Sequence, residues 1–200
     1  MRFARRLVSL TVLLGLSLGL IAPLSGAAPA ADGAVKEDWL WLQHDRTGKL
    51  RQMMGKEAPE LKAEKDKWIG DATTLKDLEG KIIIVDFWAT WCPPCRKALP
   101  KNVELQTRYK EQGVVFLGVH DSQRGSEKMP EMAKDMKLNY PLAVDAASAS
   151  TKAWNIQFWP TYYAIDRKGV VRAAPINPAH LEDVIKALLE EQPAKKITTD

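Results

Sequence analysis

Residues 82–95 read Ile-Ile-Ile-Val-Asp-Phe-Trp-Ala-Thr-Trp-Cys-Pro-Pro-Cys, an apolar run that ends in two cysteines. A continuous β-branched run of this length predicts a central strand that is covered on both faces. Beyond Cys95 a polar and apolar stretch extends to Glu111 and stops at Gly113, which predicts a helix that begins at the cysteine pair. A buried strand therefore delivers a Cys-x-x-Cys motif to the start of a helix.

This position gives the two thiols different chemistry. Unpaired amides and the helix dipole at an N-terminus favour an anion, so they lower the pKa of a thiol, and Cys92 becomes a thiolate within roughly pH 4–8. We expect Cys92 to be the nucleophile. Cys95 lies one turn deeper on the same face and is expected to attack the mixed disulfide that Cys92 forms, so that two electrons pass between dithiol and disulfide.

A cysteine pair can also bind zinc, attach haem or form a structural disulfide. Zinc requires four ligands, and the chain offers one cysteine pair with three scattered histidines, His44, His120 and His180. Haem attachment requires a histidine directly after the second cysteine, where this chain has Arg96. A bridge across so short a loop constrains the unfolded chain little, so stability alone explains it poorly. The motif favours redox chemistry, and we expect neither a metal nor a cofactor.

Composition narrows the class of protein. The 200 residues are 46% hydrophobic and 27% charged, as in an ordinary soluble protein with a hydrophobic core. Residues 1–30 carry three arginines and no acid, so the rest of the chain keeps only one of the four net positive charges. A balance this close to neutral gives no basic footprint for nucleic acid.

The first thirty residues have the layout of a secretory signal peptide. Three arginines precede the apolar stretch 7–22, and small residues with Ala28-Pro29-Ala30 follow as a cleavage site. The apolar stretch is about 16 residues long, short of the roughly 20 that a spanning helix needs. We therefore expect a mature chain that begins near Ala31 in the periplasm or another extracytoplasmic space. An uncleaved signal that anchors the chain in the membrane is the alternative.

The remaining chain is divided into three parts by its patterns. We expect an N-terminal extension at 31–56, a folded domain at 57–192 and a polar tail at 193–200. An edge strand is predicted at 60–64, before the central strand 82–88. Further strands are predicted at 114–119, 141–144, 162–165 and 170–172, and a turn with Gly169 joins the last two as a hairpin. The predicted helices are 126–138 and a last helix with Asn177 as N-cap and Pro178 at its first position. This order predicts an α/β fold with a central mixed β-sheet flanked by helices.

Two motifs resemble those of the thioredoxin superfamily. The segment 86–95 resembles the active-site segment of thioredoxins, and Trp159-Pro160-Thr161 resembles the cis-proline loop opposite it. With the signal peptide, Ala58-Pro59 and the helix and strand at 126–144, residues 57–190 resemble the exported TlpA/ResA-type subgroup. The resemblance implies a thioredoxin fold with an N-terminal extension and a helix–strand insertion. Gly118-Val119-His120 together with Trp159-Pro160 also resembles soluble thioredoxin-like modules attached to membrane electron carriers.

The resemblance also implies roles for individual residues. Asp86, six positions before Cys92, resembles the buried carboxylate that helps to deprotonate the second cysteine. A lone acid inside an apolar strand is costly unless it is used, which supports this role. The resemblance further implies that Trp91 packs beside the nucleophile. By the same resemblance, Pro160 in the cis form is expected to present the backbone of its neighbours, Trp159 and Thr161, to the substrate as an added strand.

Several positions depart from the thioredoxin pattern. Pro93 replaces the usual glycine and removes one backbone donor near the Cys92 sulfur. Trp159 is bulkier than the usual aliphatic residue, and Ala174-Pro175 stands where the family often has glycine. Because of these departures, the identity of the substrate does not follow from the resemblance. His120 ends a strand near the expected site, where we expect a structural rather than a catalytic role.

The resemblance implies a thiol–disulfide oxidoreductase. We expect a reductase of disulfides in exported proteins, such as an apocytochrome c awaiting haem, that takes its electrons from a membrane thiol carrier. A disulfide oxidase and a copper(I)-binding chaperone that uses Cys92 and Cys95 are the alternatives, although no further Met or His ligand is assured beside the pair. The Pro-x-x-x-Thr-x-x-Cys setting usual for a thiol peroxidase is absent from the sequence.

Overall fold

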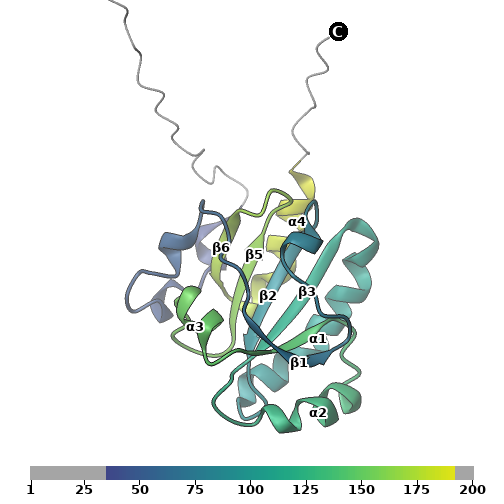
Figure 1. Ribbon diagram of the computed structural model, residues 1–200. Helices are drawn as coiled ribbons and strands as arrows, with labels where there is room; N and C mark the ends of the chain where they lie inside the picture. Colours follow the sequence, from purple (N-terminus) through teal and green to yellow (C-terminus); the bar gives the residue numbers. More distant parts are fainter. Residues whose placement is uncertain (1–34, 192–200) are drawn as a thin grey trace, which may run out of the picture.

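The computed structural model describes residues 35–191, so the predicted signal peptide (1–30) and polar tail (193–200) lie outside the described residues. A six-stranded sheet runs through its centre with the strand order β1-β4-β3-β2-β5-β6 (Figure 1). The strands are β1 (Ala63–Ile69), β2 (Ile82–Trp88), β3 (Val114–His120), β4 (Leu142–Asp145), β5 (Thr161–Ile165) and β6 (Val171–Ile176). The sheet is mixed, because β2, β3 and β4 pair in parallel whereas the other three pairings are antiparallel.

Helices cover both faces of this sheet. Within residues 35–191 the α-helices are α1 (Pro93–Tyr109), α2 (Met129–Asp135), α3 (Ala149–Ala153) and α4 (Leu181–Glu190). Short 3-10 turns lie at Glu37–Trp39, Leu42–His44, Arg51–Met53, Lys76–Leu78, Lys110–Gln112, Ser126–Lys128 and Pro178–His180. In the described part of the chain, no helix has both the length and the apolar character required to cross a bilayer.

Strand β2 is the centre of two hydrophobic cores, because side chains of a strand point alternately to opposite faces. All seven of its residues are buried, as its continuous apolar run predicts. Even-numbered side chains such as Ile84 pack with α1, α2 and α4. Odd-numbered side chains such as Val85 pack on the opposite face with Leu50, Met53 and Trp154. The cysteine turn follows directly from this rigid strand.

The N-terminal extension packs along the β6 edge of the sheet. Leu40 forms an isolated bridge with Ile176, and the Trp41 N–H donates to the Pro175 carbonyl at 2.8 Å. Further along the segment, Met53 is buried in the core that contains Val85. The extension is therefore part of the packed domain rather than a separate unit.

The predicted α/β fold with a central mixed sheet is confirmed, and the element limits show where local patterns mislead. The predicted edge strand at 60–64 is wrong in its limits, because β1 begins at Ala63 and its pairing with β4 carries it to Ile69. The predicted helix 126–138 is broken. A 3-10 turn at Ser126–Lys128 leads into the seven-residue α2, and Lys137 with a φ of 53° lies beyond its end.

Other limits agree with the patterns. The predicted hairpin turns at Gly169, whose φ of 81° is the left-handed conformation that glycine adopts without strain. Asn177 accepts a hydrogen bond from the Ala179 N–H at 3.1 Å, so it caps the last helical segment as predicted. Helix α3 was not expected from the pattern. It forms because the buried Asp145 carboxylate accepts the N–H groups of Ser150 and Thr151 at 2.8 and 2.9 Å.

Candidate active site

The two cysteines are joined as a disulfide at the start of α1. Their Cα atoms are 5.3 Å apart, and the side chains of Cys92 and Cys95 are 3% and 1% exposed. Cys92 is the N-cap of the helix, and its Sγ accepts the Cys95 N–H at 3.2 Å. The outer sulfur therefore lies where the helix dipole favours negative charge.

The two prolines between the cysteines shape both the helix start and the electrostatics. Proline suits the first helical positions because its φ is fixed near the helical value and the missing N–H has no helical partner there. Pro93 and Pro94 occupy those positions in α1. The same two residues supply no amide donor to the Cys92 sulfur, which the Cys95 N–H alone contacts among the described hydrogen bonds.

Asp86 lies on β2 beneath α1 and is 1% exposed. Its Oδ2 accepts the Asn102 side-chain N–H at 2.9 Å. Burial raises the pKa of the Asp86 carboxyl to about 8, although hydrogen bonding with Tyr162 and Asn102 acts in the opposite direction. Burial of a lone acid in an apolar strand disfavours its charged form, which accounts for this direction.

Trp91 is held over the cysteine turn by three neighbours and is still 37% exposed. Its Nε1–H donates to Asp121 Oδ2 at 3.2 Å, and the Arg124 guanidinium lies 4.6 Å from the centre of its ring. The centres of the Trp91 and Trp159 rings are 5.8 Å apart. The loop that carries Trp159 therefore lies directly beside the cysteine turn, as the two motifs predicted.

The residues after Trp159 lead into β5. The Trp159–Pro160 peptide bond is cis, and both Pro160 and Thr161 are buried. The Thr161 hydroxyl donates to the Phe158 carbonyl at 2.5 Å, so it closes the loop on itself. Thr161 then pairs with Phe87 of β2. The structure thus brings the Trp159–Thr161 loop and the cysteine strand together.

His120 is fully buried at the end of β3 and holds the cysteine turn in place. Its Nδ1 lies 2.6 Å from the Asp121 carbonyl oxygen, and its Nε2 accepts the Thr90 N–H at 2.8 Å. These partners require the neutral ring with the proton on Nδ1, and burial lowers the His120 pKa in agreement. The Thr90 hydroxyl in turn donates to the Gly125 carbonyl at 2.6 Å.

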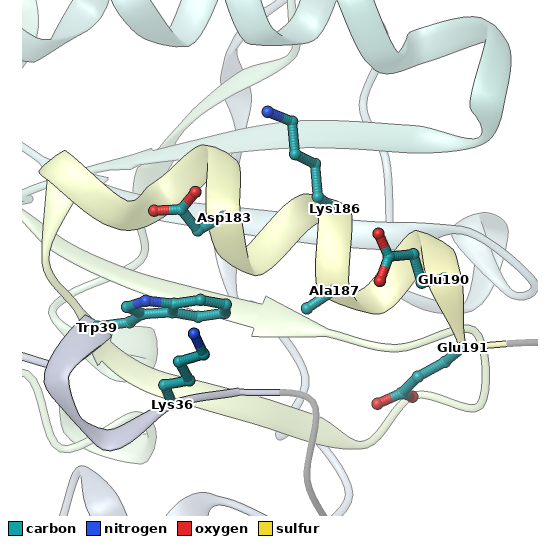
Figure 2. A pocket seen from close by; sticks show the side chains of 7 residues that line it. All are labelled: Lys36, Trp39, Asp183, Lys186, Ala187, Glu190 and Glu191. Carbon is teal, nitrogen blue, oxygen red and sulfur yellow. The ribbon is translucent and has the colours of Figure 1, made fainter.

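Two surface pockets of the described chain are lined by neither Cys92 nor Cys95. A groove of about 520 Å³ between α1 and α2 begins at Pro93 and is lined by the charged side chains of Arg96 and Lys128. A second pocket of about 490 Å³ lies between the extension and α4, where the Lys36 ammonium is 5.3 Å from the centre of the Trp39 ring (Figure 2). It contains none of the predicted site residues. In the described chain, no three His, Cys, Asp or Glu side chains gather as metal ligands.

Two residues of the site are not among those that the sequence predicts. Asn102 donates to both Asp86 and Tyr162, and Tyr162, although distant in the sequence, stands opposite Asp86 in the pairing of β2 with β5. Asn102 had a signal, because it lies seven residues after Cys95 on the buried face of the predicted helix, where an apolar residue is expected. Tyr162 had none, since its place opposite Asp86 depends on the pairing of β2 with β5.

Comparison with known proteins agrees with this geometry. The profile of the AhpC/TSA family matches residues 54–174, which is more than half of the chain. The chain belongs to the AhpC/TSA family. Over 123 residues it is 33% identical to the thiol-disulfide oxidoreductase ResA of Bacillus cereus, and the match covers 62% of this chain and 69% of ResA.

Two further relatives of this AhpC/TSA protein differ in length. The protein DipZ of Mycobacterium bovis is 36% identical over 102 residues, which are 49% of this chain but only 15% of DipZ. A solved thiol:disulfide interchange protein of the thioredoxin family from Chlorobium tepidum is 28% identical with a TM-score of 0.57, covering 66% of this chain and 95% of that one. The thioredoxin fold and the resemblance to ResA-type proteins are confirmed, and the chain is an oxidoreductase of this class.

Proposed function

We propose that this protein reduces disulfides of exported proteins by dithiol–disulfide exchange at Cys92 and Cys95. The observation that carries the proposal is the cysteine pair at the N-terminus of α1, with Cys92 as the N-cap. The exposed Trp91 beside it and the Trp159–Thr161 loop supply a surface on which a substrate chain can lie.

The reaction starts from the reduced pair. The Cys92 thiolate attacks one sulfur of the substrate disulfide, forms a mixed disulfide and releases the other substrate sulfur as a thiolate. Cys95 then loses its proton and attacks Cys92 Sγ, which forms the Cys92–Cys95 bond and releases the second substrate sulfur. The substrate disulfide gains two electrons, and the cysteine pair loses them.

The direction of electron flow follows from how well the thiolate is stabilised. A strongly stabilised thiolate favours the reduced form of the enzyme and makes an oxidant. Pro93 and Pro94 remove two amide donors from the start of α1, so the Cys92 thiolate is acidified only modestly. This favours the disulfide form of the enzyme, and hence a reductant.

The measurement that tests the direction is the reduction potential of the pair, obtained by equilibration with a thiol–disulfide buffer. We expect a value closer to the about −270 mV of thioredoxin than to the about −120 mV of DsbA. A value near the latter would instead indicate the disulfide oxidase.

The partners and location belong to the same proposal. The signal-like residues 1–30 support export. An apocytochrome c as one substrate class and a membrane thiol carrier as the electron donor are what the resemblance of residues 57–190 to the exported TlpA/ResA-type subgroup implies. A Cys95→Ser variant expressed with its export signal should trap the substrate as a mixed disulfide on Cys92, since the attacking thiol is absent. If the Cys95→Ser variant formed no mixed disulfides with exported proteins, the proposal that exported proteins are its substrates would be contradicted.

A further inference from the structure

We propose that Asn102 and Tyr162 are positioning residues that hold the Asp86 carboxyl so that its oxygen Oδ1 takes the proton of Cys95 during resolution of the mixed disulfide. This inference rests on the proposed thiol–disulfide exchange and adds two residues to it. It concerns the second step of the reaction, in which Cys95 must become a thiolate.

The contacts place these three side chains in one buried cluster. The Asn102 amide nitrogen lies 2.9 Å from Asp86 Oδ2 and 3.0 Å from the Tyr162 hydroxyl oxygen, so one amide group donates to both. Asp86 and Tyr162 also stand opposite each other in the pairing of β2 with β5. None of the three side chains is more than 1% exposed.

The two oxygens of the Asp86 carboxyl are not equivalent. Oδ2 is engaged by Asn102, whereas Oδ1 is buried and has no hydrogen-bond partner among the described residues. A buried carboxylate oxygen without a donor is unfavourable when charged, and protonation relieves this cost. The proton therefore binds at Oδ1, and Asn102 determines which oxygen remains free.

Helix α1 connects the cluster to the cysteines. Cys95, Leu99 and Asn102 follow one another at spacings of four and three residues, so they share one face of the helix. All three are buried, and Asn102 contacts Asp86 directly. The helix face that carries the second cysteine thus also covers the carboxyl.

Few other titratable groups face Asp86. Tyr140, whose hydroxyl is also buried without a partner among the described residues, and Tyr162 are the neighbouring phenols. Burial, and after it the charge of Asp86, raises the pKa of both. His120 of β3 is committed to Thr90 and Asp121. Helix α4 contributes only apolar side chains to this core, namely Leu181, Val184, Ile185, Leu188 and Leu189. Hydrogen bonding with Tyr162 and Asn102 is thus what holds the Asp86 pKa down against burial.

The proton transfer balances within the chain. Cys95 Sγ gives its proton to Asp86 Oδ1, and the freed electron pair forms the bond to Cys92 Sγ. The bond between Cys92 and the substrate sulfur breaks, and that sulfur leaves as a thiolate. No further reductant or oxidant is required.

The variant that tests the inference is Tyr162→Phe, and its matched control is Tyr163→Phe. Tyr163 is the next residue, is equally buried and donates its hydroxyl proton to the Trp154 carbonyl on the other side of the sheet. Both variants remove one buried hydroxyl from β5, but only the first removes one that contacts the Asp86 cluster. Asn102→Ala is a second variant that removes a donor from Asp86.

Ellman's reagent separates the two steps by rapid mixing with reduced protein. Its first coloured thiolate is released when Cys92 attacks, and the second when Cys95 resolves the mixed disulfide. We expect the first release to be unchanged in Tyr162→Phe and the pH midpoint of the second to rise by about one to two units, as for loss of one hydrogen bond to a charged group. Asn102→Ala should move it in the same direction, and Tyr163→Phe should leave it in place.

The outcomes distinguish the two proposals. If the wild-type protein gives no first release, thiol–disulfide exchange itself is contradicted. If the first release occurs but the midpoint of the second is the same in wild type, Tyr162→Phe and Asn102→Ala, the cluster has no part in resolution and the inference is overturned. A slower second release with an unchanged pH midpoint would overturn it as well, since a merely structural defect has that signature.

Discussion

Replacement of Asp86 by asparagine should stabilise the folded protein, and the gain should depend on pH. The folded state holds the Asp86 proton up to about pH 8, whereas an unfolded chain releases it near the ordinary pKa of 3.8. The folded pKa is raised, so this carboxyl costs nothing below pH 3.8 and destabilises the fold progressively as the pH rises towards 8. Asparagine has the same shape and never ionises.

The size of the effect follows from the difference between the two pKa values. Each pH unit between them favours the unfolded state by about 1.4 kcal/mol. At pH 7 the cost of Asp86 is therefore of the order of 4 kcal/mol, and Asp86→Asn should recover a large part of it. Asp86 Oδ1 already lacks a partner among the described residues, and we expect the asparagine side chain to leave one atom unpaired at the same place, so that cost cancels in the comparison.

Urea denaturation of the oxidised protein at a series of pH values measures this effect. We expect the difference in the free energy of unfolding to be near zero at pH 4 and largest at pH 8. Asp77→Asn is the contrasting control, because Thr74 hydrogen bonds lower the Asp77 pKa and that carboxylate stabilises the fold at neutral pH. If Asp86→Asn gave the same difference at pH 4 and pH 8, the carboxyl would not be a buried acid with a raised pKa, and the reasoning would fail.

Three further predictions concern the cysteine turn. Alkylation of the reduced protein, followed by peptide mapping, should find Cys92 labelled before Cys95, and Cys92→Ser should abolish disulfide reduction. Faster labelling of Cys95 would mean that Cys95 is the nucleophile and Cys92 the resolving thiol. Gly125→Ala should lower the free energy of unfolding by about 1–3 kcal/mol, because the added Cβ would lie 2.5 Å from Thr90 Oγ1 and the φ of 81° is strained for alanine; an unchanged denaturation midpoint would contradict this. Trp159→Ala should lower kcat/KM for a peptide disulfide but leave the reaction with Ellman's reagent intact, since only the larger substrate contacts the ring; equal losses for both substrates would exclude a role in substrate binding.

The parts of the fold that depend on residues close together in the sequence can be predicted from it. The run 82–88 identifies the central strand because every residue is apolar except Asp86, and Cys92 marks the helix start because two prolines follow it. The ends of helices and strands are harder to predict from the sequence where they depend on tertiary pairing. Strand β1 is placed by its partner β4, and the helix predicted at 126–138 is divided because Met129–Asp135 alone takes α-helical geometry.

The candidate site divides in the same way. Its cysteines and Asp86 are visible in one segment of ten residues, and Trp159 and Pro160 form a second motif. Tyr162, however, meets Asp86 only through the register of β2 with β5, and no spacing in the sequence specifies that register. His120 ends a strand, which suggests a structural residue, but its hydrogen bond with Thr90 becomes apparent only in the folded chain.

The buried polar atoms of the described chain show where stability is lost. Four side-chain atoms are buried without a partner, on Asp86, Trp88, Tyr140 and Trp154. The first three lie on the side of the sheet that α1 covers, the side that also holds both cysteines, and Trp154 lies on the other. Buried polar groups are normally satisfied, so such a concentration is unfavourable for the fold. It is useful for exchange chemistry, because a carboxyl whose pKa is raised to about 8 is, once ionised, a base of about the strength of a thiolate and can take the proton of Cys95. The same burial that makes Asp86 destabilising is thus what suits it to accept a proton from a thiol.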